Sequence, residues 1–187
     1  MREAEARQWT DAELVSSALD GSEEAYAELV RRYQDLLYRH AERMAGSPDE
    51  AEDIVQLAFI RSYRNLATCQ NPDHVGAWMF RIAANACKDH LKSRRGDGIR
   101  IDDALGLADN TGDPEMELER SDMRSRINSA LRRLPVDQRE AFVMKHVEGL
   151  SYQEMGELLG VSVPALKMRV HRAREDLQEL LGRERHD

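Results

Sequence analysis

The sequence predicts an all-α protein made of two small helical domains joined by an acidic, flexible linker. Helix-capping signals are dense along its 187 residues, and no segment alternates apolar and polar residues for long enough to suggest a strand. A stretch rich in glycine and aspartate interrupts the helical pattern near the middle of the chain. Because a chain of this length fits two small domains, we place the boundary at that interruption.

Capping signals mark where most of the helices begin and end. Three Ser/Thr-x-x-Glu sequences, in which two side chains can satisfy each other's free backbone N–H groups, begin at Thr10, Ser47 and Ser151. Gly46 and Gly160 stand where helices are expected to end, because glycine adopts the left-handed conformation at little cost. Together with apolar periodicity, these signals predict helices over residues 11–20, 23–45, 48–66, 73–94, 114–133, 137–147, 152–159 and 163–181.

Residues 96–113 combine glycine, aspartate and asparagine without helical periodicity. A structureless stretch of this length is uncommon inside a compact domain, so we interpret it as a linker. It separates an N-terminal domain, residues 1–95, from a C-terminal domain, residues 114–187. Both parts are long enough to be domains with a core.

Charge is segregated along the chain, although the net charge of −8 argues against a nucleic-acid binder as a whole. The stretch Gly96–Glu117 holds seven acids and one arginine. By contrast, Trp78–Arg95 holds five lysines and arginines against one aspartate, and Ser162–Arg174 holds four and no acid. Two basic segments therefore flank an acidic one, which suits nucleic-acid contacts confined to two places.

Cys69 and Cys87 are too few for a disulfide framework and fit a reducing cytosol. The N-terminal residues contain no apolar run, so we expect no signal peptide. No segment approaches the roughly 20 apolar residues that span a bilayer. We therefore expect a soluble, cytoplasmic protein without membrane insertion.

The clearest motif lies within Leu150–Leu181. A short helix, residues 152–159, is followed by the turn Gly160–Ser162 and by a longer helix, which is typical of a helix-turn-helix. Ser162 can cap the second helix, and Pro164 falls in its first turn, where a missing N–H costs little. The second domain is therefore predicted to contain a helix-turn-helix.

The second helix of this motif has two different faces. On a helical wheel, an apolar face carries Leu166, Val170, Ala173 and Leu177. The opposite, largely basic face carries Lys167, Met168, His171 and Arg172. In a major groove such a face would meet base edges and phosphates. The alternative is a surface helix whose solvated side happens to be basic, but the motif favours DNA binding.

A basic helix also ends the first domain, over residues 73–94, and the preceding loop holds several turn formers. Trp78 could stack on a base, as aromatic residues do in single-strand binders, and Asn85 could hydrogen-bond a base edge. The helical spacing by itself favours a core tryptophan and a solvated asparagine. Both interpretations therefore stay open at this point.

The helix over residues 48–66 is apolar on nearly every side. One side carries Ala51, Ile54, Val55 and Ala58, and a mixed strip elsewhere carries Asp53, Gln56, Leu57, Ile60 and Arg64. A small domain needs one buried stripe per helix, so a second apolar surface suggests a partner protein. Alternatively, this helix is central and the others wrap it; the pattern does not decide.

No motif predicts catalysis, since a glycine-rich phosphate loop and a recognisable Ser-His-Asp grouping are both missing from the sequence. We therefore expect no enzymatic activity, no catalytic residues and no cofactor. A Cys₂His₂ zinc site is conceivable from Cys69, His74, Cys87 and His90. Their irregular spacing disfavours this possibility, and we expect no metal.

Three segments in order resemble the extracytoplasmic-function (ECF) class of bacterial sigma factors, and the likeness covers nearly the whole chain. The sequence EDIVQLAFIRSYRNL is similar to the polymerase-binding segment of that family, and AWMFRIAANACKDHLKSRR to its promoter-melting segment. The sequence LRRLPVDQREAFVMKHVEGLSYQEMGELLGVSVPALKMRVHRARE is similar to its second-domain signature. Three motifs in order are far more specific than any one of them.

The resemblance implies a sigma factor, active in a stress response, that binds core RNA polymerase and directs it to promoter DNA, with an anti-sigma factor as a further partner. Contact with the clamp helices of the polymerase would involve Asp53, Gln56, Leu57 and Ile60. The melted −10 element would meet the loop before Trp78 together with Trp78, Asn85, Lys88 and Lys92. The duplex −35 element would be read by Lys167, Met168, His171 and Arg172.

Leu57 departs from the family pattern, since an acidic residue is common at this position, so an ionic contact is not expected there.

Two other classes of protein remain as alternatives. A stand-alone helix-turn-helix regulator should bind duplex DNA tightly without polymerase. A pure interaction module, such as an antagonist of another sigma factor, would lack the basic recognition face.

Overall fold

The structure is a computed structural model, and it describes residues 9–96 and 126–183. Within these ranges every regular element is a helix and no strand occurs, so the predicted all-α class is confirmed. The predicted linker over residues 96–113, apart from Gly96, lies outside the described residues, as does the first part of the helix predicted over 114–133. No helix in the described ranges has the length and apolar character needed to cross a membrane.

The N-terminal helices follow the predicted order. They are α1 (Asp11–Leu19), α2 (Glu23–Ala45), α3 (Pro48–Asn65) and α4 (Val75–Gly96). Two short 3₁₀ turns, η1 (Leu66–Thr68) and η2 (Pro72–His74), connect α3 to α4. The helix predicted from residue 73 therefore begins two residues later, because the chain first makes the tighter turn that starts at Pro72.

The C-terminal helices comprise residues 126–133, α6 (Val136–His146), α7 (Tyr152–Leu159) and α8 (Val163–Arg183). The α7–turn–α8 unit is the predicted helix-turn-helix. Gly160 ends α7 with φ 67°, in the left-handed region, and the chain then turns into α8. The helix end predicted at Gly160 is therefore confirmed.

Two of the three predicted capping boxes form. At Thr10 and at Ser151 the hydroxyl accepts a hydrogen bond from the backbone N–H three residues on. The carboxylate of the glutamate at that position accepts a hydrogen bond from the backbone N–H of the cap residue. Ser47 makes no such side-chain bond, so the prediction there was wrong. The glutamate that would complete that box, Glu50, instead meets His90 of α4, with Nε2 of the histidine 3.0 Å from its Oε2.

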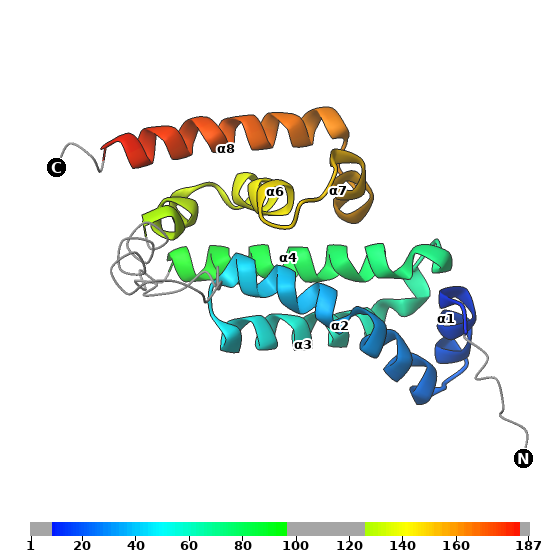
Figure 1. The fold of residues 1–187 in the computed structure, drawn as a ribbon. Helices are drawn as coiled ribbons and strands as arrows, with labels where there is room; N and C mark the ends of the chain where they lie inside the picture. The colour runs from blue at the N-terminus through cyan, green and yellow to red at the C-terminus, as the bar shows by residue number, and fades with distance from the viewer. Residues whose placement is uncertain (1–8, 97–125, 184–187) are drawn as a thin grey trace, which may run out of the picture.

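Helix α4 lies between two layers (Figure 1). It contacts α2 and α3 on one side and α6 and α7 on the other, while α8 packs over α6 and α7. One buried apolar cluster runs through both layers, from Leu29, Leu37 and Phe80 to Met155 and Leu166. The N-terminal helices α1–α4 therefore share this cluster with α6, α7 and the first half of α8, whereas residues 130–134 pack with Ala173 and Leu177 in a second cluster.

Candidate nucleic-acid interface

The outer face of α8 is exposed along its first half. Leu166, Val170, Ala173 and Leu177 are buried against the neighbouring helices. The four residues predicted to read DNA are all exposed: Lys167, Met168, His171 and Arg172. The predicted division of this helix into a packed face and an open face is therefore confirmed, although packing alone does not test what the open face binds.

The side chains of this open face differ in whether they already contact another residue of the protein. Lys167 lies over the ring of Tyr152, with Nζ 5.9 Å from the ring centroid, a weak cation–π contact. His171 Nε2 is 3.5 Å from Glu175 Oε1 in an exposed pair, which contributes little to stability. Arg172 is exposed and pairs with no residue that the structure describes. Arg172 is thus available for a base or a phosphate.

A pocket of about 300 Å³ lies where the end of α3 meets the first half of α4. It is lined by Arg61, Asn65, Thr68, Trp78, Ile82 and Asn85. The structure thus brings together Trp78 and Asn85, which the sequence singled out separately. Trp78 is half-buried and packs against the apolar cluster while it also lines the pocket, so the core role and the binding role are compatible.

Three lining residues of this pocket, Arg61, Asn65 and Thr68, were missed from the sequence because they come from α3 and η1. Arg61 Nη1 lies 3.3 Å from Asp89 Oδ2 of α4, and the Asn65 amide donates to the Arg61 carbonyl oxygen at 2.7 Å. Their four-residue spacing near the end of a helix is the signal that could have found them. The pocket therefore offers an aromatic ring, two amides and a guanidinium within one small volume.

The two lysines predicted on α4 have different surroundings. Lys92 is exposed. The Lys88 ammonium lies 2.8 Å from Glu140 Oε2 and 3.1 Å from Asp137 Oδ1, both on α6. Burial lowers the pKa of Lys88, but the charge and hydrogen bond of Glu140 and the contact with Asp137 raise it overall, so this lysine stays protonated. One predicted DNA contact is therefore already paired with carboxylates.

The strip predicted on α3 for a partner protein is exposed. Asp53 and Gln56 face solvent, and the apolar Leu57 and Ile60 are 41% and 44% exposed. The opposite side of the helix, which carries Ala51, Ile54 and Ala58, is buried. Helix α3 is thus not wrapped on every side, which removes the alternative that the pattern left open.

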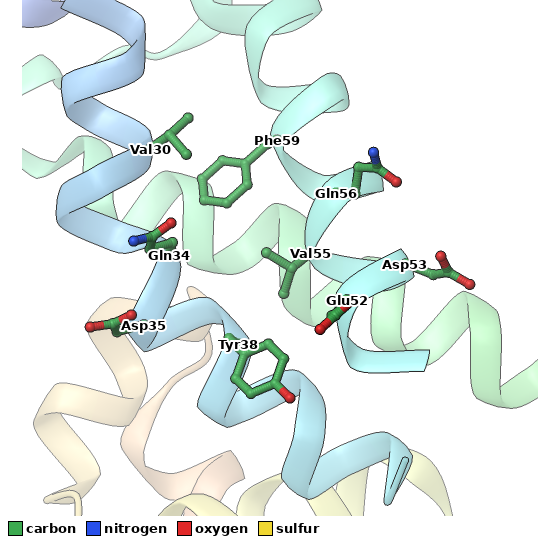
Figure 2. Close-up of a pocket in the computed structure, with 9 residues that line it drawn as sticks. All are labelled: Val30, Gln34, Asp35, Tyr38, Glu52, Asp53, Val55, Gln56 and Phe59. Carbon is green, nitrogen blue, oxygen red and sulfur yellow. The ribbon is translucent and has the colours of Figure 1, made fainter. Parts of the chain in front are cut away.

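A groove of about 600 Å³ runs beside this strip, between α2 and α3 (Figure 2). It is lined by Val30, Gln34, Asp35, Tyr38, Glu52, Asp53, Val55, Gln56 and Phe59. The residues from α2 could not be found from the sequence, because the groove forms only where α2 packs beside α3. Apolar side chains line the groove and three carboxylates, Asp35, Glu52 and Asp53, lie along it, so it suits an apolar segment that also carries positive charge.

The structure does not assemble the conceivable zinc site. No cluster of three or more potential ligands from histidine, cysteine and acidic residues occurs within the described part of the chain. Burial raises the pKa of Cys87 to about 12, with the charge of Glu140 adding to the rise, so its thiol keeps its proton at neutral pH. Metal binding requires the thiolate, and this environment opposes its formation.

Comparison with known proteins matches both halves of the chain. A family model described as Sigma-70 region 2 matches residues 29–96, and one described as Sigma-70, region 4 matches residues 124–177. The ECF RNA polymerase sigma factor SigW of Bacillus subtilis (strain 168) is 32% identical over 177 residues, which covers 89% of this chain and 94% of SigW. Relatives of this kind thus align with nearly the full length of the chain.

Two solved structures resemble the fold. CnrH in complex with the cytosolic domain of CnrY has a TM-score of 0.61 and 29% identity, covering 92% of this chain and 97% of CnrH. The sigma factor RpoE of Bartonella quintana, in complex with the anti-sigma factor NepR, has a TM-score of 0.59 and 25% identity, covering 84% and 96%. The sequence relatives, the two matched family regions and the fold all indicate the same family. The chain therefore belongs to the ECF RNA polymerase sigma factors, transcription initiation factors that direct RNA polymerase to promoters and are not enzymes.

Proposed function

We propose that this sigma factor works through three separate surfaces. The pocket between α3 and α4 receives the melted −10 element, the open face of α8 reads the −35 element, and the surface of α3 beside the α2–α3 groove binds core polymerase. The observation that carries the proposal is the meeting of Trp78 and Asn85 in one pocket with the amide and guanidinium groups of α3.

The −10 pocket has the chemistry of a site for a single unpaired base. Its volume of about 300 Å³ falls at the lower end of small-molecule sites. The ring of Trp78 offers a stacking surface, and the amides of Asn65 and Asn85 offer donors and acceptors for a base edge. Arg61, and Lys88 and Lys92 further along α4, would then contact the phosphates of the same strand.

The polymerase surface combines Leu57 and Ile60, which are exposed and apolar, with the polar Asp53 and Gln56. Exposed apolar groups in a polar surround are typical of an interface with another protein. The clamp helices of the polymerase would lie across α3 and place side chains into the groove of Figure 2.

We further propose that each of three segments of the chain has its own function. Residues 1–95 would form the polymerase-binding and −10 domain, residues 96–113 the acidic linker, and residues 114–187 the −35 domain. Because RpoE of Bartonella quintana was solved with an anti-sigma factor, we propose a partner of this class here as well. The site of action would be the cytoplasm, where the promoter DNA lies and where two unpaired cysteines, Cys69 and Cys87, persist.

Transcription in vitro from core polymerase, with and without the chain, tests the proposed function directly. The chain should be required for initiation at its own promoters and should bind duplex DNA only weakly by itself. Tight binding to duplex DNA without polymerase, combined with unchanged transcription, would instead indicate a stand-alone regulator.

Replacing Asp53 and Gln56 together by alanine should weaken core polymerase binding while leaving the melting temperature nearly unchanged, because both side chains are exposed. Affinity for core polymerase and thermal unfolding measure the two effects. The matched control is Glu157→Ala with Gln178→Ala, which removes an exposed acid and an exposed glutamine from α7 and α8. Unfolding of the Asp53/Gln56 variant would show that this strip is structural and would overturn the assignment.

Arg172→Ala should cost about 1–3 kcal/mol on the preferred promoter and relax selectivity at one −35 position, if the guanidinium makes a bidentate contact with a base. Folding should stay intact because the side chain is exposed. Binding of the holoenzyme to promoters that differ at single −35 positions measures this effect. A uniform loss on all sequences, with the salt slope reduced by about one unit, would mean a phosphate contact instead.

A further inference from the structure

Helix α1 lies beside the start of α4 (Figure 1). It contacts η1, η2 and α4, and its Leu14, Val15 and Ala18 are buried in the apolar cluster. The turns η1 and η2 belong to the loop that precedes Trp78, and Thr68 of η1 lines the −10 pocket. Helix α1 therefore packs against the segment that leads into this pocket.

Two residues of α2 hold the first residue of α1 through its side chain. The carboxylate of Asp11 accepts a hydrogen bond from the Tyr33 hydroxyl at one oxygen and from Arg32 Nη1, 3.0 Å away, at the other. The same guanidinium donates to the carbonyl oxygen of Trp9 at 2.7 Å and to Glu28 Oε1 at 3.1 Å. Burial raises the pKa of Tyr33, and the hydrogen bond and charge of Asp11 raise it further, so the phenol keeps its proton and stays a donor. The hydroxyl end of Tyr33 is thus held by an acceptor that is itself fixed.

The ring of Tyr33 lies against the backbone of Gly76, in the first turn of α4. A Cβ added at Gly76 would come 2.7 Å from Cζ and 3.0 Å from Cδ1 of the tyrosine, and closer still to Cε1. Carbon atoms pack at about 3.5–4.0 Å, so either the ring or the helix would have to move. Because Asp11 holds the hydroxyl, the ring cannot simply swing aside. Glycine is a poor helix former, and this close approach explains its place in the turn.

We propose that Tyr33, held at its hydroxyl by Asp11, positions Trp78 in the −10 pocket. Trp78 follows Gly76 by two residues on the same helix, so the contact between the ring and the first turn determines where the indole lies relative to Asn65 on α3. A binding residue has to be held within about 0.5 Å of its productive place by packing and hydrogen bonds of this kind. The proposal rests on the role proposed above for this pocket in −10 binding.

The surroundings of Trp78 can be measured without DNA or polymerase. Trp9 is the only other tryptophan in the sequence, so Trp9→Leu leaves Trp78 as the single tryptophan whose fluorescence is recorded. In this background, Gly76→Ala should shift the emission of Trp78 and raise its quenching by acrylamide, because the overlap with Tyr33 pushes the first turn of α4 away from α2. Adding Tyr33→Leu should reverse both changes, since leucine lacks the two closest ring atoms and has no hydroxyl to hold it.

The matched control is Gly182→Ala in α8. It makes the same change within a helix, but a Cβ at Gly182 meets no atom of the described residues within 4 Å, so the emission of Trp78 should stay unchanged. Emission that also stays unchanged in Gly76→Ala, or that fails to return when Tyr33→Leu is added, would overturn the positioning of Trp78 by Tyr33.

A second variant guards against a folding defect in Gly76→Ala. Tyr33→Phe deletes one hydroxyl and keeps the ring, so it should fold. Because Asp11 no longer holds the ring, quenching of Trp78 should rise in the same direction as in Gly76→Ala but by a smaller amount. Quenching equal to that of the parent would overturn the role of Asp11.

The effect on the −10 element is measured as permanganate reactivity of unpaired thymines in the holoenzyme–promoter complex. Gly76→Ala should lower opening about fivefold or more, the loss expected when one base no longer stacks, while affinity for core polymerase stays unchanged. Adding Tyr33→Leu should restore opening together with the emission. Normal opening despite a changed emission would refute the role of the pocket in −10 binding and leave the positioning of Trp78 standing, whereas a loss of opening with unchanged emission would refute the positioning.

Discussion

Leu166→Ala is expected to destabilise the C-terminal helices by about 2–5 kcal/mol, because it deletes most of a fully buried side chain and leaves a cavity. Leu166 lies on the packed face of α8 and belongs to the cluster that continues into the N-terminal helices. Thermal unfolding followed by circular dichroism measures the effect. Each kcal/mol lowers the melting temperature by about 2–4 °C in a chain of this size.

The matched control lies two residues further along the same helix. Met168 is 49% exposed, so Met168→Ala removes a side chain of similar size from the open face and should change stability by no more than about 0.5 kcal/mol. The same variant should weaken −35 binding if the methionine touches a base. Equal destabilisation by the two substitutions would contradict the division of α8 into a packed and an open face.

The helices and their buried faces could be predicted from the sequence because a helix repeats every 3.6 residues. Leu166, Val170, Ala173 and Leu177 return to one side at that interval, and all four are buried. The cap at Ser47 could not be predicted in the same way. Its glutamate has a competing partner, His90, forty residues further along the chain, and no local pattern reveals such a competition.

The association of the two sets of helices was also hidden from the sequence. Glutamate is usually exposed, and it is rarely buried unless a partner from elsewhere in the fold pairs with it. Nothing in the local sequence therefore marks Glu140 as a residue without exposed surface. The resemblance to the family predicts that Lys88 contacts DNA, whereas its pairing with α6 depends on tertiary packing. Similarly, Trp78 and Asn85 were found on one helix, whereas Arg61 and Asn65, which complete their pocket, lie on another.

Trp78→Leu combined with Asn85→Ala should strongly impair promoter opening while leaving core polymerase binding unchanged. Stacking of one base on an aromatic ring contributes about 1–3 kcal/mol, and a hydrogen bond to a base edge adds about 1 kcal/mol. Together these losses correspond to about 30-fold or more in affinity for the melted strand. Permanganate reactivity of unpaired thymines in the holoenzyme–promoter complex measures the opening.

The substitution Trp78→Leu separates the packing role of the tryptophan from its proposed stacking role. Trp78 packs partly against the apolar cluster, and leucine keeps much of that packing while it removes the flat ring that a base would stack on. The melting temperature should therefore fall only slightly, whereas opening should be lost. Trp9→Leu is the control, because Trp9 is an exposed tryptophan that does not line the pocket, and this change should leave opening intact. Normal opening in the Trp78/Asn85 variant, or a loss that merely follows a fall in stability, would mean that the pocket between α3 and α4 does not hold the −10 base and that Trp78 serves the core alone.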